Sequence, residues 1–214
     1  MQNHEFGDRV VVLDHPLIDH KLSVLRNEIT PSSVFRQTVH EITLLECYEA
    51  TKHLITKEVE VKTPLATCVC KSIAKQEPVI VPILRAGLAM LDAMLEVIPS
   101  APVAHLGMYR DETTHKPIEY YAKMPGYIAE RQVLLVDPML AGSICAALHA
   151  LQNRGVKDIT IMVIVAAPEG IRTVLDADPD VRIYTCALDE GLNENAYIIP
   201  GLGDAGDRIF QTTG

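Results

Sequence analysis

Apolar residues in the central part of the chain form short continuous runs that alternate with helical patterns. Runs of consecutive hydrophobic residues are typical of buried strands, and they occur at residues 79–84, 103–108, 133–136, 158–166 and 181–186. Between these runs, apolar residues recur at helical spacing over 88–98, 144–151 and 168–175. Strands that alternate with helices predict an α/β fold, with a mainly parallel central sheet and helices on both of its faces.

The segments before and after this core have weaker patterns, and we expect one domain over residues 1–214. It would consist of an N-terminal helical layer (1–76), the core sheet (77–187) and a C-terminal segment (188–214). In the N-terminal layer the patterns predict strands at 10–13 and 58–62 and helices over 17–25 and 34–54. Thr63-Pro64 predicts a further helix, because Thr is a good N-cap and Pro suits the first helical position.

Composition and charge narrow the class of protein. The chain has 214 residues, of which 48% are hydrophobic and 22% charged, as expected of a compact globular core. The formal net charge of −9 argues against a broad nucleic-acid surface, which needs a basic face. No apolar run reaches the roughly 18 residues that span a bilayer, and the first residues are too polar for a secretory signal. We therefore expect a cytoplasmic protein without nucleic-acid or membrane partners.

Cysteine and histidine give no metal-binding signature. The five cysteines are an odd number without a Cys-x-x-Cys pair, and no histidine pair has zinc spacing. Such cysteines are expected to be reduced thiols. His15, His20, His40 and His53 are expected to be surface or packing residues.

Polar side chains follow three of the predicted strands at their carboxyl ends. These are Arg85-Ala86-Gly87, Tyr109-Arg110-Asp111 and the segment from Asp137 to Ser143. Ligands of parallel sheets bind beyond these ends. Arg85 and Arg110 would suit a polyanion, because a guanidinium binds phosphate oxygens as a fork.

The third strand end has the pattern of a sugar-phosphate site. Asp137 closes a buried strand and could accept hydrogen bonds from ribose hydroxyls. The small residues that follow lead into a helix, whose N-terminal N–H groups bind phosphate. An ordinary βα corner would show the same pattern, and this segment alone leaves both interpretations open.

Two further stretches differ from ordinary connections. Residues 109–126 are long and polar, which is typical of a β-arm that closes over a site or of an exposed hairpin in a dimer contact. Residues 201–206 match G-x-G-x-x-G, but too few residues follow to complete a βαβ unit, so a dinucleotide site is not expected. These glycines would instead form a loop whose backbone reads a planar base, with Ile198 and Ile199 as an apolar wall.

Six segments together resemble the uracil phosphoribosyltransferase family. They lie in the family's order along nearly the whole chain, at residues 14–18, 82–87, 109–111, 136–141, 166–170 and 200–208. The resemblance implies a type I phosphoribosyltransferase fold with a flexible β-arm or hood. It also implies a reaction that joins uracil to 5-phosphoribosyl 1-diphosphate (PRPP), giving UMP and diphosphate with Mg²⁺ bound mainly through PRPP.

The resemblance also assigns binding residues. PRPP would be held by Arg85, Arg110, Asp137, Pro138, Met139, Leu140, Ala141, Gly142, Ser143 and Asp204. Uracil would be read by Ile198, Gly203, Asp204 and Ala205. No single catalytic residue is assigned, because uracil N1 is moderately acidic once its carbonyls are hydrogen-bonded. The family further implies a homodimer or homotetramer and GTP as an activator, although no motif locates a GTP site.

The phosphate loop departs from the family pattern. The family has Asp-Pro-Met-Leu-Ala-Thr-Gly-Gly-Ser, whereas here Ala141 is followed directly by Gly142-Ser143. A true loss of Thr-Gly would remove donors to the 5-phosphate and weaken PRPP binding by about two or three orders of magnitude. The alternative to an active transferase is therefore a catalytically weak PRPP- or nucleotide-binding regulator. An RNA-binding regulator on the same fold is disfavoured by the negative charge.

Overall fold

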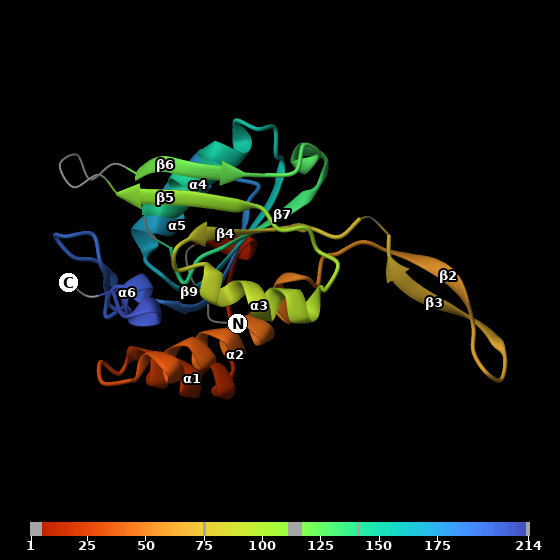
Figure 1. Cartoon of the computed structure of the whole chain (residues 1–214), viewed down its shortest axis with the longest axis horizontal. Helices are drawn as coiled ribbons and strands as arrows, with labels where there is room; N and C mark the ends of the chain where they lie inside the picture. Colours follow the sequence, from red (N-terminus) through yellow and green to blue (C-terminus); the bar gives the residue numbers. More distant parts are fainter. Residues whose placement is uncertain (1–5, 75, 111–116, 141, 213–214) are drawn as a thin grey trace.

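The chain folds around a mainly parallel β-sheet, as the alternating pattern predicts (Figure 1). The computed structural model describes residues 6–74, 76–110, 117–140 and 142–212, and within these the sheet has eight strands. Their order is β1-β10-β9-β7-β4-β5-β6, with β8 beside β9, and only the β5–β6 pair among them is antiparallel. The strands are β1 (Val10–Val12), β4 (Val79–Leu84), β5 (His105–Arg110), β6 (Pro117–Lys123), β7 (Gln132–Val136), β8 (Met139–Leu140), β9 (Asp158–Ala166) and β10 (Arg182–Leu188).

Helices cover both faces of this sheet (Figure 1). One face packs against α1 (Pro16–Arg26), α2 (Ser32–Ala50), α3 (Leu88–Val97) and α6 (Ala205–Phe210), and the other against α4 (Gly142–Gln152) and α5 (Pro168–Ala177). The side chains of a strand alternate between the two faces. In β7, for example, Leu134 and Val136 pack with the first group of helices, and Val133 and Leu135 pack with the second. Burial on both faces explains why the central strands are continuously apolar.

The connections reverse direction between β4 and β7. From β4 the chain passes through α3 to β5 on one side, whereas β7 leads through α4 to β9 on the other. Such a switch point opens a crevice at the carboxyl ends of the two strands. Gly87 allows the β4–α3 turn to lie close to β7, because a Cβ there would be 2.5 Å from the carbonyl oxygen of Val136. The absence of a side chain at position 87 is thus what lets this turn pack closely against β7.

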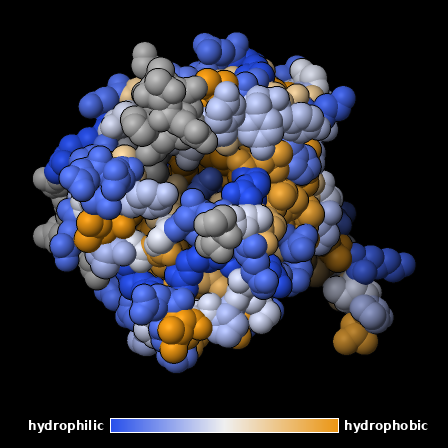
Figure 2. Space-filling view, turned by 60° about the vertical axis from the view of Figure 1, so that its left-hand side comes forward, coloured by the Kyte–Doolittle hydropathy of each residue, from blue (hydrophilic) through white to orange (hydrophobic). Residues whose placement is uncertain are grey.

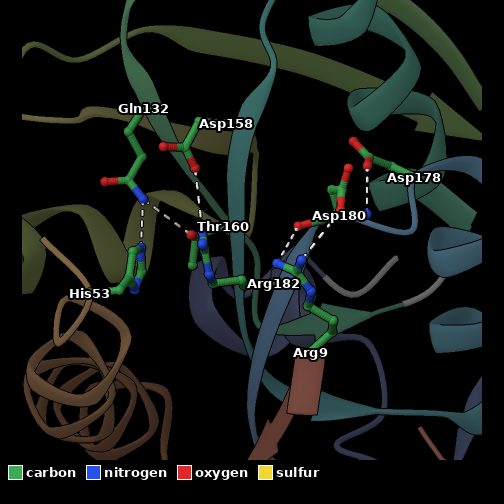
Figure 3. Close-up of polar contacts among 8 residues, drawn as sticks. All are labelled: Arg9, His53, Gln132, Asp158, Thr160, Asp178, Asp180 and Arg182. Carbon is green, nitrogen blue, oxygen red and sulfur yellow. Dashed lines mark hydrogen bonds and ion pairs between the residues drawn. The ribbon is translucent and has the colours of Figure 1, made fainter. Parts of the chain in front are cut away.

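The amino ends of the central strands are joined by polar side chains at the opposite edge of the sheet (Figure 3). Gln132 at the start of β7 lies 2.6 Å from Nε2 of His53, which follows α2, and 3.4 Å from Thr160 of β9. Arg182 of β10 lies 3.4 Å from the carboxylate of Asp158. These contacts connect the helical layer to the sheet at the end away from the switch point.

The helix predicted from Thr63-Pro64 is wrong. Residues on both sides of this dipeptide form an antiparallel hairpin of β2 (Thr56–Lys62) and β3 (Thr67–Ile73), which projects from the body of the protein (Figure 1). The Thr63 hydroxyl accepts hydrogen bonds from the backbone N–H groups of Leu65 and Ala66, at 3.2 and 3.0 Å. It caps a tight turn instead of a helix, and Pro64 suits the second position of that turn. The strand predicted at 58–62 is confirmed, and its side chains are mostly exposed.

Smaller differences concern element ends and short elements. The strand predicted at 103–108 begins later, at His105, and the helix predicted to Leu54 ends at Ala50. The short elements that periodicity did not indicate are β8, β11 (Gly191–Leu192), β12 (Ile198–Ile199), α6, and the 3₁₀ turns at Gly7–Arg9 and Ile128–Glu130. In the described part of the chain, no helix has the length and apolar character needed to cross a membrane.

Candidate functional site

A cavity of about 640 Å³ lies at the carboxyl ends of β4, β5 and β7, where the topology predicts a crevice. Figure 2 shows the surface hollowed near the middle of the view, with hydrophilic and hydrophobic side chains next to each other around the hollow. The cavity brings together predicted site residues from four separate segments. These are Arg85, Asp137, Met139, Ser143, Ile198, Gly203, Asp204 and Ala205.

Other residues expected in the site do not line the cavity or fall outside the description. Leu140 is fully buried and packs against Gly170, where a Cβ would lie 2.7 Å from the Leu140 carbonyl oxygen. The carbonyl of Pro138 accepts hydrogen bonds from the N–H groups of Ile164 and Val165 in β9. Pro138 and Leu140 therefore hold the loop on the sheet, and Gly142 begins α4 without lining the cavity. Ala141 lies outside the described residues, and Arg110 is described only as the last residue of β5.

Asp137 is a buried carboxyl group on the cavity wall. Its side chain accepts a hydrogen bond of 3.0 Å from the backbone N–H of Met139, and only 8% of the residue is exposed. Burial raises the pKa of Asp137 to about 7, and the nearby negative charge of Asp204 adds to the increase. The hydrogen bond from Met139 opposes this shift only in part. The group can therefore change its protonation state near neutral pH.

Arg85 extends from the end of β4 toward the C-terminal segment. Its Nη2 lies 3.1 Å from the carboxylate of Asp207, and its Nη1 donates a hydrogen bond of 2.9 Å to the hydroxyl of Thr212. The Thr212 hydroxyl in turn donates to Asp207 at 2.6 Å. The hydrogen bonds from Thr212 and Arg85 lower the pKa of Asp207 below its usual value. Asp207 and Thr212 thus fix the direction of a cation at the edge of the cavity.

The C-terminal loop forms a further part of the cavity wall. Gly201 and Gly203 have φ of +60° and +71°, in the left-handed region that favours glycine. At Gly201 a Cβ would also lie 2.1 Å from the carbonyl oxygen of Ile198. Asp204 then caps α6, because its side chain accepts a hydrogen bond from the N–H of Asp207 at 2.9 Å. Residues 196–198 and 203–206 of this segment line the cavity.

Arginines that the sequence analysis did not single out anchor this loop to α1. Arg26 forms a two-pronged pair with the buried carboxylate of Asp189, with distances of 2.5 and 2.9 Å, and donates to the carbonyl of Gly201 at 3.0 Å. The N–H of Gly201 donates to the same carboxylate at 2.8 Å. Arg208 lies over the ring of Phe35, 4.3 Å from its centroid, and binds carbonyl groups at the end of α1. These partners are distant in the chain, and no local pattern marks them.

Aromatic side chains at the cavity were also missed as site residues. Tyr109 of β5 and Tyr120 of β6 both line it, with ring centroids 6.1 Å apart, and Tyr197 lines it from the C-terminal loop. Pairing of β5 with β6 shows that part of the polar stretch 109–126 is a β-arm beside the site. Residues 111–116, at the end of this arm, lie outside the described residues.

The sequence of the chain matches one known protein family over nearly its whole length. The sequence model of that family, described as "Uracil phosphoribosyltransferase", matches residues 12–212. The chain belongs to the uracil phosphoribosyltransferase family. The uracil phosphoribosyltransferase of Thermoanaerobacter sp. (strain X514) is 55% identical over 205 residues, which cover 95% of this chain and 98% of the relative. That of Agathobacter rectalis is 54% identical over 206 residues, covering 95% and 99%.

Solved structures agree with this assignment of the fold. The AQ2163 protein from Aquifex aeolicus superposes with a TM-score of 0.89 at 37% identity, covering 95% of this chain and 99% of that one. The adenine phosphoribosyl transferase from Trypanosoma brucei, solved with AMP, pyrophosphate and ribose-5-phosphate, has a TM-score of 0.58 at 10% identity and covers 88% of this chain and 86% of that one. At this low identity the second likeness supports the phosphoribosyltransferase fold alone. The predicted type I phosphoribosyltransferase fold is confirmed.

Proposed function

We propose that the protein transfers the 5-phosphoribosyl group of PRPP to uracil, giving UMP and diphosphate in pyrimidine salvage. The observation that carries this proposal is the cavity at the switch point. It places Arg85, Asp137 and the C-terminal loop around one space. A diphosphate, a ribose and a planar base each require a different partner, and these elements supply an arginine, a carboxylate and exposed backbone groups. Relatives named uracil phosphoribosyltransferase match nearly the whole chain.

Each part of PRPP and uracil is assigned to one part of the cavity. Arg85 and Arg110 bind the diphosphate, and Asp137 accepts hydrogen bonds from the ribose hydroxyls. The 5-phosphate binds at the end of the loop from Pro138 to Ser143, through backbone N–H groups at the start of α4. Uracil lies against Ile198 and the backbone of residues 203–205, where N–H and C=O groups match its carbonyls and N3–H.

The reaction forms a bond between uracil N1 and the anomeric carbon of ribose. The bond from that carbon to diphosphate breaks, the diphosphate leaves with the electron pair, and the N1 proton passes to solvent. Positive charge grows on the ribose as the bond breaks, and the carboxylates of Asp137 and Asp204 stabilise it. Arg85 stabilises the negative charge of the departing diphosphate. Catalysis then depends on position and charge, so we assign no general base.

The side chains at the cavity fit Mg²⁺ bound together with PRPP. Mg²⁺ uses one or two protein carboxylates beside substrate phosphates and waters, and Asp137 and Asp204 both line the cavity. Among the described residues, no cluster of three or more His, Cys, Asp or Glu side chains could hold a metal by itself. When bound, Mg²⁺ would neutralise charge on the diphosphate.

We also propose that the protein is cytoplasmic, consists of a single domain, forms a homodimer or homotetramer, and is activated by GTP.

One structural feature favours a second candidate, a weak PRPP- or nucleotide-binding regulator. β8 ends at Leu140 and α4 begins at Gly142, so a single residue connects them. A loop this short has few N–H groups left for the 5-phosphate once β8 has paired with β9. Such a protein would bind UMP or PRPP with little turnover.

Conversion of labelled uracil to UMP by purified protein with PRPP and Mg²⁺ tests the proposal. Turnover that is lost in Arg85→Ala supports the transferase. Absence of UMP over hours at millimolar PRPP, from folded protein of confirmed intact mass, would overturn it. UMP binding by calorimetry without turnover would then favour the regulator.

A further inference from the structure

An ion pair joins β6, at the edge of the sheet, to the end of α4. Nη2 of Arg154, which follows α4, lies 2.7 Å from Oε1 of Glu119 in β6, and Nη1 lies 3.2 Å from Oε2. The same guanidinium donates a hydrogen bond of 2.8 Å to the carbonyl of Ala150, in the last turn of α4. The two side chains remain 34% and 32% exposed. Three bonds thus hold Glu119 in a fixed place relative to α4.

The ion pair holds the outer part of the β-arm that β5 and β6 form. At its inner end the arm packs on the hydrophobic core around α4, through Ala122 and Met124. Glu119 lies nearer the outer end, directly opposite Met108. Two positions beyond Met108 on β5 is Arg110, to which the proposed function assigns the diphosphate. The ion pair therefore fixes the part of the arm that leads to Arg110.

A β-bulge beside Glu119 directs Tyr120 toward the cavity. In the ladder of the arm, Gly107 is opposite Tyr121. The next residue of β5, Met108, is opposite Glu119, so Tyr120 is the extra residue of the bulge. Its ring lies on Gly107, where a Cβ would be 2.6 Å from Cζ, and it lines the cavity. The residue in the ion pair and the residue at the cavity are thus neighbours in the chain.

We propose that Glu119 and Arg154 are positioning residues for PRPP. The proposed function, on which this inference rests, assigns PRPP to the outer β-arm and to the start of α4. Arg154 binds the arm and the last turn of α4 at once, so it fixes these two parts of the cavity relative to each other. Glu119 and Arg154 are not among the described residues that line the cavity, so they act through residues that do, such as Tyr120.

Steady-state kinetics of the full-length protein tests the pair, with PRPP varied and uracil at saturation. Glu119→Gln removes the charge and keeps the size, and Arg154→Met keeps the apolar stem. Each variant should raise the KM for PRPP by about three- to fivefold, the range of a partly exposed ion pair, and change kcat less than about twofold. Arg9→Met is the matched control, because it breaks an exposed ion pair with Asp180 at the opposite edge of the sheet (Figure 3). It should leave both constants unchanged.

Exchange of the two charges separates the ion pair from other effects of each substitution. Glu119→Arg and Arg154→Glu should each raise the KM for PRPP, since each places two like charges together. The combination of the two forms an ion pair of reversed polarity and should recover part of the loss. Additive losses in the double variant would overturn the positioning role of the pair.

Hydrogen exchange of the ligand-free protein measures the arm independently of the reaction. The backbone N–H groups of β6 should exchange about three- to fivefold faster in Glu119→Gln and in Arg154→Met than in the native protein, and those of β9 should not change. A native protein that forms no UMP would overturn the proposed function. Equal exchange rates of β6 in the native protein and both variants would overturn this inference whether or not UMP is formed. An unchanged KM for PRPP in an active enzyme would overturn it as well.

Discussion

The guanidinium of Arg85 lies 3.1 Å from the carboxylate of Asp207, across 122 positions of the sequence. Both residues are partly exposed, and Thr212 completes the contact by bonding to each of them. An exposed ion pair contributes little to stability. The ion pair instead orients Arg85, so that its remaining N–H groups face the cavity in a fixed direction.

We expect Asp207→Asn to weaken PRPP binding more than it changes the chemical step. Loss of the charged partner allows Arg85 to adopt other rotamers, so the KM for PRPP should rise by about three- to tenfold with little change in kcat. Steady-state kinetics with uracil held at saturation measures this. A fall in the KM would show that Asp207 competes with diphosphate for Arg85 instead of orienting it.

The pKa of Asp137 predicts the pH dependence of PRPP capture. Burial and Asp204 raise the pKa of Asp137 to about 7 in the ligand-free protein. The ionised carboxylate accepts ribose hydroxyls, so kcat/KM for PRPP should rise with pH by about tenfold per unit below this value and level off above it. Asp137→Asn should give a low rate without that inflection. A flat native profile between roughly pH 6 and 8 would contradict this role.

Glu46 on α2 predicts a pH-dependent loss of stability. The side chain is fully buried, and neither carboxylate oxygen has a hydrogen-bond partner among the described residues. Burial raises the pKa of Glu46 well above its usual value, and the nearby backbone amide of Val163 offsets only part of this. A raised folded pKa means that the folded state binds the proton more tightly. Its contribution to stability is complete below the unfolded pKa and is lost as the pH rises toward the folded one.

Glu46→Gln removes this titration. Relative to the variant, the native protein should lose about 1.4 kcal/mol of unfolding free energy per pH unit between the two pKa values. Urea unfolding of both proteins at about pH 5 and about pH 7 measures this difference in unfolding free energy. If the difference in unfolding free energy between the two proteins is the same at both pH values, folding does not raise the pKa of Glu46, and the prediction is wrong.

The anchor of the C-terminal loop predicts a selective effect on uracil. Arg26→Met leaves the carboxylate of Asp189 buried without its cation, which should cost about 3 kcal/mol of unfolding free energy. Since the same arginine holds the carbonyl of Gly201, the KM for uracil should rise more than that for PRPP. Arg26→Met with Asp189→Asn removes the unpaired charge and should recover part of the stability. Equal changes in both KM values would place the effect outside the loop.

The sequence pattern predicted the elements whose conformation depends on residues nearby in the chain. The strands at 79–84 and 158–166 are buried on both faces and therefore read as continuous apolar runs. The helix predicted from Thr63-Pro64 is wrong because this dipeptide suits either the start of a helix or a turn. The turn forms because Val59 pairs with Cys70 and Val61 pairs with Cys68. In the candidate site, Arg85 and Asp137 were predictable from strand ends. The pair of Arg26 and Asp189 was not, since its members are 163 positions apart.

The short connection between β8 and α4 predicts that an insertion strengthens PRPP binding. Leu140 ends β8 and Gly142 begins α4, and the family pattern has Thr-Gly between Ala141 and Gly142. Insertion of Thr-Gly there adds backbone N–H groups and a hydroxyl at the helix start. We expect the KM for PRPP to fall by at least about tenfold, because each hydrogen bond to a charged group contributes about 1.5–3 kcal/mol.

A Gly-Gly insertion at the same place is the matched control, because it restores the backbone donors without the hydroxyl. It should recover part of the gain, and the difference between the two variants measures the hydroxyl alone. The KM for uracil should change little in both, since Ile198 and residues 203–205 lie on a separate segment of the cavity wall. An unchanged or higher KM for PRPP in both insertions would show that the short loop already forms a complete phosphate site. Native turnover would then need no donors beyond those of α4 and Ser143.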